Sequence, residues 1–291
     1  MTEARKSRVL RAKLAVASAR IEASERRSDA IVAVGSVLGR TARRLLLRVH
    51  ANEQIPLPQP LVVAGTSFDI LDDLGAYTGL TDAVVARLVQ RRLDSFRAEW
   101  FLTPEELRAD DWYYRATSAY LFGNAVHLHG ADVLVRLVEQ VQPAPRNALD
   151  FGGGTGNLAL ALAALGWTVD HLERSAVQKD FTRFRVPRYA LEGSVRVLDD
   201  WEPLKRDAYD LICAIDVLEH VHDLDAVVLG RLLPALRSGG SFIEASPFHR
   251  TLSNPMHHEH THLDKLLASA GLTLADGRDG YRVWRQPSTT P

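Results

Sequence analysis

The stretch D-F-G-G-G-T-G at residues 150–156 constrains this chain more than any other. It follows an apolar run, Ala148–Phe151, which predicts a strand, and it precedes a helical pattern at Leu158–Leu165. Glycine adopts positive φ easily and lets a ligand approach the backbone closely. The N-terminus of the helix that follows offers free N–H groups and a positive dipole end. The stretch therefore predicts a strand–loop–helix turn that binds a nucleotide-type cofactor.

Two other phosphate-binding patterns were compared with this loop. The P-loop is excluded because no G-K-[ST] follows the glycines. The dinucleotide fingerprint G-x-G-x-x-G fails when it starts at Gly152 or Gly153. A start at Gly154 gives Gly156 and then Ala159, the alanine variant, so the loop alone does not exclude NAD.

From residue 146 onward, short apolar or β-branched runs alternate with helical patterns, which indicates βαβ units. We expect an α/β fold with a Rossmann-like, mostly parallel seven-stranded sheet. The expected strands are Ala148–Phe151, Thr168–Leu172, Val195–Leu198, Leu211–Ile215, Ser241–Ala245, Leu272–Ala275 and Tyr281–Arg285. The expected helices are Leu158–Leu165, Ala176–Phe184, Leu224–Leu236 and Leu263–Ala270.

The first half of the chain has a helical texture. We predict a basic helical arm at residues 1–52, a helical cap or substrate region at 53–145 and the cofactor domain at 146–291. Residues 53–66 are predicted to be a loop because they contain Pro56, Pro58, Pro60 and Gly65. Residues 1–50 carry 12 Lys and Arg against 4 Asp and Glu, although the whole chain has a net charge of -1. This arm is interpreted as a solvated helical arm or hairpin that packs on a second subunit, and contact with an anionic partner or a membrane surface is the alternative.

Composition excludes several classes of protein. A single cysteine, Cys213, rules out an intrachain disulfide and a multi-Cys zinc site, and its place in an expected strand makes it a core residue. No apolar run approaches the roughly 20 residues that a membrane span requires. No signal peptide is apparent, so we expect a cytoplasmic protein.

The fuller string D-x-G-x-G-x-G resembles motif I of class I S-adenosylmethionine-dependent methyltransferases. Residues 209–221 resemble the fourth-strand motif of the small-molecule branch that includes the ubiquinone-biosynthesis methyltransferases, and residues 233–243 resemble the segment that follows. The resemblance covers roughly residues 146–275. One departure is Gly153, where the family often has Cys, Ser or Thr.

This resemblance implies S-adenosylmethionine as the cofactor and assigns residues to it. Glu173 ends the second strand, where a carboxylate accepts both ribose hydroxyl protons. Asp199 or Asp200 would meet the adenine amino group, and Trp201 would pack on the purine. The full expected cofactor set is Asp150, Gly152, Gly154, Gly156, Glu173, Asp199, Asp200, Trp201 and Asp216.

Histidine is the expected base if the acceptor must lose a proton. His220 follows the fourth strand and His257 lies in the loop after the fifth, so both are candidate catalytic residues, with a structural role for His220 as the alternative. The expected acceptor contacts are Tyr113, Tyr120, His127 and His249, and ordinary helix packing is the alternative for those in the helical region. Residues 258–262 match H-E-x-x-H, but that pattern binds metal only on a helix. Because Pro255 precedes it, we expect no metal site.

These observations predict methyl transfer to an oxygen or nitrogen atom of a small biosynthetic molecule. One alternative is a non-catalytic, cofactor-binding regulatory subunit that acts through the basic arm. Another is an RNA methyltransferase, which the arm's charge suggests. The fourth-strand segment lacks the N-P-P-[YF] and paired-cysteine signatures of many nucleic-acid methyltransferases, so a nucleic-acid partner is not expected.

Overall fold

A computed structural model describes residues 56–91, 100, 114, 119–126, 131–141, 146–199, 204–249, 256–278 and 280–288. The predicted basic arm, residues 1–52, lies outside these ranges. The chain divides into two compact units, one with residues 1–59, 69–102 and 118–126 and the other with 60–68, 103–117 and 127–291. Residues 60–68, 103–117 and 127–145 of the predicted cap region belong to the second of these units.

The first unit is helical in its described part, as expected. It contains α3 (Ile70–Thr78), α4 (Asp82–Gln90), α8 (Ala119–Gly123) and the 3-10 turn η2 (Asn124–Val126). Asp69 caps α3 because its carboxylate accepts from the backbone N–H groups of Leu71 and Asp72, at 3.0 and 3.1 Å. Gly79 ends α3 in the left-handed conformation, at φ 71°.

The predicted loop at residues 53–66 is wrong for part of its length. Strands β1 (Leu61–Val63) and β2 (Thr66–Phe68) form an antiparallel hairpin whose turn contains Gly65. Both strands are only three residues long, and the three prolines lie before them. Val63 and Phe68 are buried in a hydrophobic core of the second unit. Burial of this apolar pair therefore overrides the local turn signals.

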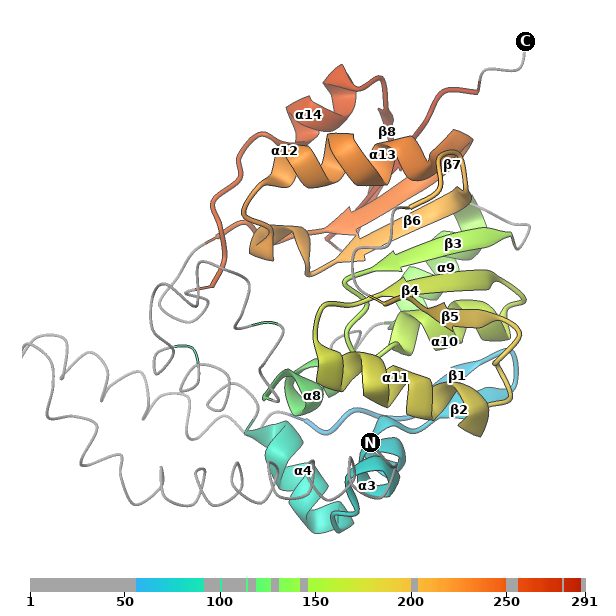
Figure 1. Cartoon of the computed structure of the whole chain (residues 1–291), viewed down its shortest axis with the longest axis vertical. Coiled ribbons are helices and arrows are strands. Elements are labelled where there is room, and N and C mark those ends of the chain that lie inside the picture. The colour runs from blue at the N-terminus through green and yellow to red at the C-terminus, as the bar shows by residue number, and fades with distance from the viewer. Residues whose placement is uncertain are drawn as a thin grey trace, which may run out of the picture. The chain divides into compact units, whose positions relative to one another are not determined.

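The seven-stranded sheet of the second unit confirms the predicted fold class (Figure 1). Its strand order is β5-β4-β3-β6-β7-β9-β8, with β3 to β7 parallel and β9 antiparallel to both neighbours. The strands are β3 (Asn147–Phe151), β4 (Thr168–Leu172), β5 (Val195–Val197), β6 (Tyr209–Ile215), β7 (Leu236–Ala245), β8 (Thr273–Arg278) and β9 (Tyr281–Arg285).

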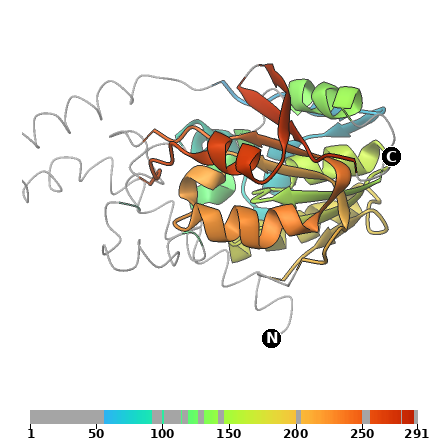
Figure 2. The ribbon, with the colours of Figure 1, turned by 90° about the horizontal axis from the view of Figure 1, so that it is seen from above.

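Helices cover both faces of this sheet, because central parallel strands bury both faces. In β6, Leu211 and Cys213 face one core cluster while Ile212 and Ala214 face the other. The first cluster includes residues of α9 (Ala131–Val141), α10 (Asn157–Ala164) and α11 (Ala176–Arg188). The second includes residues of α12 (Leu224–Val227), the π-helical turn η4 (Val228–Leu232), α13 (Leu233–Ala235) and α14 (Leu263–Ser269). Figure 2 shows α9 and the α12–α13 segment on opposite sides of the sheet.

In this unit, the prediction for Cys213 is confirmed and the prediction of one helix at Leu224–Leu236 is partly wrong. Cys213 is fully buried in β6, as predicted, and burial raises the pKa of its thiol. The single helix predicted at Leu224–Leu236 is interrupted by the π-helical turn, and Leu236 begins β7 instead.

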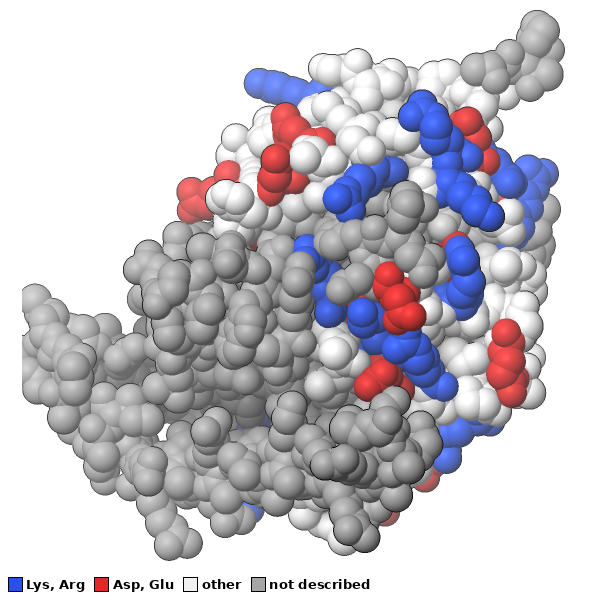
Figure 3. Space-filling view, viewed as in Figure 1, with Lys and Arg blue, Asp and Glu red and all other residues white. Residues whose placement is uncertain are grey.

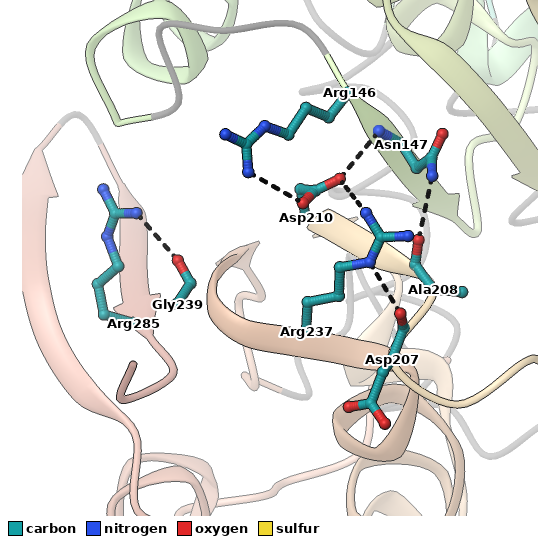
Figure 4. A network of polar contacts seen from close by, with 8 residues as sticks. All are labelled: Arg146, Asn147, Asp207, Ala208, Asp210, Arg237, Gly239 and Arg285. Atoms are coloured by element: carbon teal, nitrogen blue, oxygen red, sulfur yellow. Dashed lines mark hydrogen bonds and ion pairs between the residues drawn. The ribbon is translucent and has the colours of Figure 1, made fainter. Parts of the chain in front are cut away.

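A polar network holds the amino ends of β3, β6 and β7 together, at the edge opposite the glycine loop (Figure 4). The buried carboxylate of Asp210 accepts from the backbone N–H of Asn147 at 3.1 Å and from Arg237 Nη1 at 2.9 Å. Arg146 Nη1 lies 3.6 Å from the other oxygen of Asp210. Arg237 also donates to the carbonyl of Asp207 at 2.8 Å. The network thus links these strands at the end opposite the one from which the glycine loop leaves.

The described surface carries basic and acidic side chains close together (Figure 3). Arg183 of α11 pairs with Asp180 and Asp199, and Arg196 of the β5 edge strand pairs with Asp170 at 2.7 Å. Within the described ranges, no helix is long and apolar enough to cross a membrane.

Candidate cofactor and acceptor site

The glycine loop lies where the strand order of the sheet changes direction. From β3 the chain proceeds outward to β4 and β5, and it then returns to β6 on the other side of β3. The carboxyl ends of β3 and β6 are therefore neighbours with diverging connections. Open α/β sheets bind ligands in the crevice at such a switch point.

The loop has the backbone conformation that its glycines predict. Gly152, Gly154 and Gly156 have φ values of 68°, 56° and 79°. A Cβ atom on Gly152 would overlap the side chain of Val217, which follows β6, and one on Gly156 would lie 2.5 Å from Thr182 of α11. Side chains are thus excluded at both positions, and the bare backbone runs into the N-terminus of α10. This arrangement fits a nucleotide-type cofactor.

Glu173 connects this loop to the next helix. One of its carboxylate oxygens accepts from the Gly154 N–H at 2.9 Å, and the other accepts from the Ser175 N–H at 2.8 Å. Each oxygen keeps a second lone pair, because a carboxylate oxygen can accept two hydrogen bonds. Glu173 can therefore shape the loop and still accept hydrogen bonds from the two hydroxyl groups of a diol. This is the role that the family resemblance implied for it.

Asp150 lies beneath the loop, with a buried partner. Its Oδ2 is 3.0 Å from Nδ1 of His171 in β4, and the two side chains are 4% and 0% exposed. A Cβ atom on Gly153 would overlap Asp150 Oδ2 and lie 2.5 Å from His171 Nδ1. This pair occupies the space that a Cys, Ser or Thr side chain at position 153 would need.

Of the remaining expected cofactor residues, the structure describes Asp216 and Asp199. Asp216 directly follows β6, has a positive φ of 49°, and donates its N–H to the Ala245 carbonyl at 2.7 Å. The side chain of Asp199 is 80% exposed and pairs with Arg183. Asp200 and Trp201 lie outside the described residues.

The two predicted catalytic histidines come together. His220 ends the 3-10 turn η3 (Leu218–His220), and His257 reaches it from the loop that precedes α14. Their ring centroids are 4.9 Å apart and the rings are nearly perpendicular, at 78°. Tyr114 Oη lies 3.1 Å from His220 Nδ1 and donates to the Met256 carbonyl at 3.4 Å. His257 Nδ1 bonds to the Pro247 carbonyl at 2.9 Å.

Glu219 of η3 is the most deeply buried member of this cluster. It is 1% exposed, and its Oε1 lies 3.9 Å from His220 Nε2. Burial raises the pKa of the Glu219 carboxyl well above its usual range, and the charges of Asp216 and Glu244 raise it further. The Glu219 carbonyl accepts from the His258 N–H at 2.7 Å, which ties the His257 loop to η3.

Comparison with known proteins decides the family. The model of a family described as "Methyltransferase domain" matches residues 126–276, which is more than half of the chain. This chain belongs to the class I S-adenosylmethionine-dependent methyltransferases. S-adenosylmethionine is the cofactor of that family, and the bare backbone of the glycine loop fits it.

Individual relatives of this methyltransferase are distant. A ubiquinone biosynthesis O-methyltransferase of Paramagnetospirillum magneticum is 29% identical over 98 residues, which is 34% of this chain and 39% of that protein. The match thus spans well under half of the curated relative. An S-adenosylmethionine-dependent methyltransferase structure from Aquifex aeolicus has a TM-score of 0.45 at 13% identity, covering 56% of this chain and 92% of that one. A geranyl diphosphate methyltransferase structure has a TM-score of 0.43 at 18% identity, covering 57% and 67%.

The structure describes only two of the four expected acceptor residues of this methyltransferase. His249 is exposed after β7, and its backbone N–H donates to the Pro247 carbonyl at 2.6 Å. Tyr120 is partly buried in α8 of the helical unit. Tyr113 and His127 lie outside the described residues.

The H-E-x-x-H match at residues 258–262 does not form a helix, as the sequence analysis expected. The chain is irregular until α14 begins at Leu263, with His262 as its N-cap. His260 Nε2 bonds to the Val221 carbonyl at 2.8 Å, and His262 Nε2 bonds to Asp225 Oδ1 at 2.7 Å. These histidines therefore fasten the loop to the segment after η3.

Sequence reasoning missed four residues of the site. Glu219 stands inside the fourth-strand motif, where a carboxylate amid apolar residues was an available signal. Tyr114 adjoins the predicted Tyr113, which lies outside the described residues. Arg185 of α11 is fully buried and donates from Nη1 to the Thr155 carbonyl at 2.8 Å, which supports the loop. Neither Arg185 nor His171 carried a local signal.

Proposed function

We propose that this methyltransferase acts on an oxygen or nitrogen atom of a small molecule. The observation that carries the proposal is the cluster of Glu219, His220 and His257, which begins three residues beyond Asp216 at the switch point beside the glycine loop. The cofactor supplies a methyl group on a sulfonium, already activated for in-line displacement. Positioning of the two reactants can contribute about 7–11 kcal/mol of the rate enhancement.

The residues of this chain then have separate tasks. The backbone of Gly152, Gly154 and Gly156 and the carboxylate of Glu173 hold the cofactor, and the predicted contacts of Asp150, Asp199, Asp200, Trp201 and Asp216 belong to the same proposal. His220 and His257 bind the acceptor and promote loss of its proton. Acid–base assistance of this kind contributes typically 10²–10⁴-fold in rate.

Tyr113, Tyr120 and His127 of the cap and His249 after β7 are proposed acceptor contacts. A small-molecule acceptor fits the resemblance to the ubiquinone-biosynthesis branch, and a homodimer through the N-terminal helices remains our proposal for residues 1–52. Cytoplasmic localisation likewise stays a prediction.

Calorimetric titration with S-adenosylhomocysteine tests the cofactor half of this proposal. The native chain should bind it, and Gly154→Arg should abolish binding because this buried position has positive φ. Gly193→Arg is the matched control, since a Cβ there meets nothing within 4 Å. Absence of binding by the native chain would refute the proposal.

A second experiment tests the transfer itself. A cell extract incubated with enzyme and methyl-labelled cofactor should yield a labelled small molecule detected by mass spectrometry. Label found only in the RNA fraction would refute the small-molecule assignment. Binding of S-adenosylhomocysteine with no labelled product would favour the regulatory-subunit alternative.

A further inference from the structure

A polar pair crosses the interior of the sheet beneath the glycine loop. Asp150 of β3 and His171 of β4 are register partners in the parallel pairing of these strands, so their side chains project from the same face of the sheet. The same cross-strand row continues through Val197 on one side and through Cys213 and Ile243 on the other. Asp150 and His171 are thus a buried polar pair set in an otherwise apolar row.

The contacts of His171 give each ring nitrogen a separate partner. Nδ1 lies 3.0 Å from Asp150 Oδ2, and because a carboxylate can only accept, Nδ1 donates this hydrogen bond. Nε2 lies 3.5 Å from Thr182 Oγ1 of α11, which is longer than an ordinary hydrogen bond. The bond to Asp150 is therefore the stronger of the two, and it holds the carboxylate in one orientation.

This orientation determines the surface on which the glycine loop lies. The space of a Cβ atom on Gly153 is filled by Asp150 Oδ2 and His171 Nδ1, so the Gly153 backbone rests directly on the paired groups. The next residue, Gly154, donates its N–H to Glu173 at 2.9 Å. A turn of the Asp150 carboxylate away from His171 would thus change the support of the loop one residue before its bond to Glu173.

The backbone of His171 lies beside two more segments of the cofactor site. Its carbonyl accepts from the Leu198 N–H at 2.9 Å, and Leu198 directly precedes Asp199. Glu173 follows His171 by two residues. These backbone relations require no particular side chain, so it is the Nδ1 bond to Asp150 that makes this position specific for histidine.

We infer that His171 is a positioning residue of the cofactor site: its Nδ1–H fixes the Asp150 carboxylate, and through it the glycine loop, in the conformation that binds the cofactor. The inference rests on the proposed function and adds a fully buried residue that acts through Asp150. A buried carboxylate that loses its donor turns toward other donors, because an unsatisfied buried group is costly. The apparent dissociation constant then rises in inverse proportion to the fraction of molecules that keep the competent loop.

Three substitutions separate the donor of His171 from the volume of its ring. His171→Asn places an amide N–H near the Nδ1 position, and His171→Gln places one near the Nε2 position. His171→Leu keeps a similar volume and has no donor. In calorimetric titration of the full-length chain, the Asn variant should bind S-adenosylhomocysteine within about threefold of native affinity, and the Gln and Leu variants about tenfold more weakly, the order expected for loss of one hydrogen bond to a carboxylate.

Thr182→Val is the matched control for this series. It removes the hydroxyl beside Nε2 and leaves the bond between Nδ1 and Asp150, so it should bind S-adenosylhomocysteine like the native chain. Melting temperatures are measured in parallel, because a merely structural role would make affinity follow stability. His171→Asn leaves a cavity where the ring was and should melt earlier than the native chain while keeping its affinity.

A double substitution tests whether His171 acts through Asp150. In an Asp150→Asn background, His171→Leu should weaken S-adenosylhomocysteine binding by less than about threefold, because residues that act as one unit are not additive. A full further loss of about tenfold would show that His171 acts by another route and would overturn the inference.

Two other results would overturn the positioning role. Native affinity in all three His171 variants would show that the loop does not depend on this bond. An equal loss in the Asn and Gln variants would show that the ring only fills space, and this comparison stands even where the Leu variant fails to fold. In both results the native chain still binds S-adenosylhomocysteine, so the proposed function survives. A native chain that does not bind it would refute the proposed function and this inference with it.

Discussion

Gly153→Ala tests whether the Asp150–His171 pair beneath the cofactor loop is the reason that residue 153 is a glycine. Gly153 does not have positive φ, so its backbone would tolerate an L-residue. The three atoms nearest to the added methyl group belong to the side chains of Asp150 and His171. The substitution must therefore push apart two groups joined by a 3.0 Å contact in the interior.

The expected cost follows from three contributions. Overpacking a well-filled interior costs about 1–3 kcal/mol. Leaving the separated polar groups unsatisfied costs about 1–3 kcal/mol more. The lower entropy of alanine in the unfolded chain offsets about 0.4–1 kcal/mol. Gly153→Ala should thus lower the free energy of unfolding by about 1–6 kcal/mol.

Urea unfolding followed by fluorescence measures this effect, because Trp167 and Trp284 are buried in the same unit. Gly193→Ala is the control, with no positive φ and no atom within 4 Å of the added Cβ, and should stay within about 0.5 kcal/mol of the native chain. In a His171→Ala background, Asp150 can turn away, so Gly153→Ala should then cost at least about 1 kcal/mol less. Equal effects of Gly153→Ala and Gly193→Ala, or strict additivity with His171→Ala, would refute the reasoning.

Three further substitutions test other parts of the unit. Asp210→Ala should lower the free energy of unfolding by about 1–3 kcal/mol in thermal denaturation, because it removes the buried carboxylate that accepts from the Asn147 N–H and from Arg237; no loss would contradict this. Burial raises the pKa of Glu244 despite its ion pair with Arg282, so the folded state holds this proton longer and native stability falls as pH rises through that range. The melting temperature of Glu244→Gln relative to that of the native chain should therefore rise from acid to neutral pH. A constant difference would contradict the assignment. Arg185→Met removes the donor to the Thr155 carbonyl and should weaken S-adenosylhomocysteine binding about tenfold, as loss of an outer-shell contact does at metal sites. Unchanged affinity would show that the glycine loop keeps its conformation without Arg185.

The parts of the fold that the sequence predicted are those with a local physical cause. The bounds of β4 and β9 match the structure because each is a five-residue run with β-branched or aromatic residues between turn signals. The glycine loop was predictable because its glycines allow positive φ and the adjacent residues show that it lies between a strand and a helix. The hairpin at Leu61–Phe68 was missed for the opposite reason. Its strands are too short to show a period, and what stabilises them is burial against distant helices.

The π-helical turn marks a second limit of the same kind. The pattern of Leu224–Leu236 indicates one continuous helix, and most of its apolar residues do face the sheet. A π-helical turn changes the number of residues per turn without changing which residues are apolar. Periodicity can therefore locate this segment but cannot reveal the irregularity inside it.

The histidine-rich loop shows what spacing alone can and cannot say about chemistry. Its H-E-x-x-H letters match a metal motif, yet the residues lie in irregular chain where i and i+4 share no face. The preceding proline was a sound reason to reject the motif, because the described residues before Leu263 are not helical. His257, one residue before the motif, meets Glu219 and His220 only because β6 and β7 are adjacent and parallel, so their carboxyl-end loops converge. Clusters of this kind are a property of sheet topology, and a motif search restricted to one segment cannot find them.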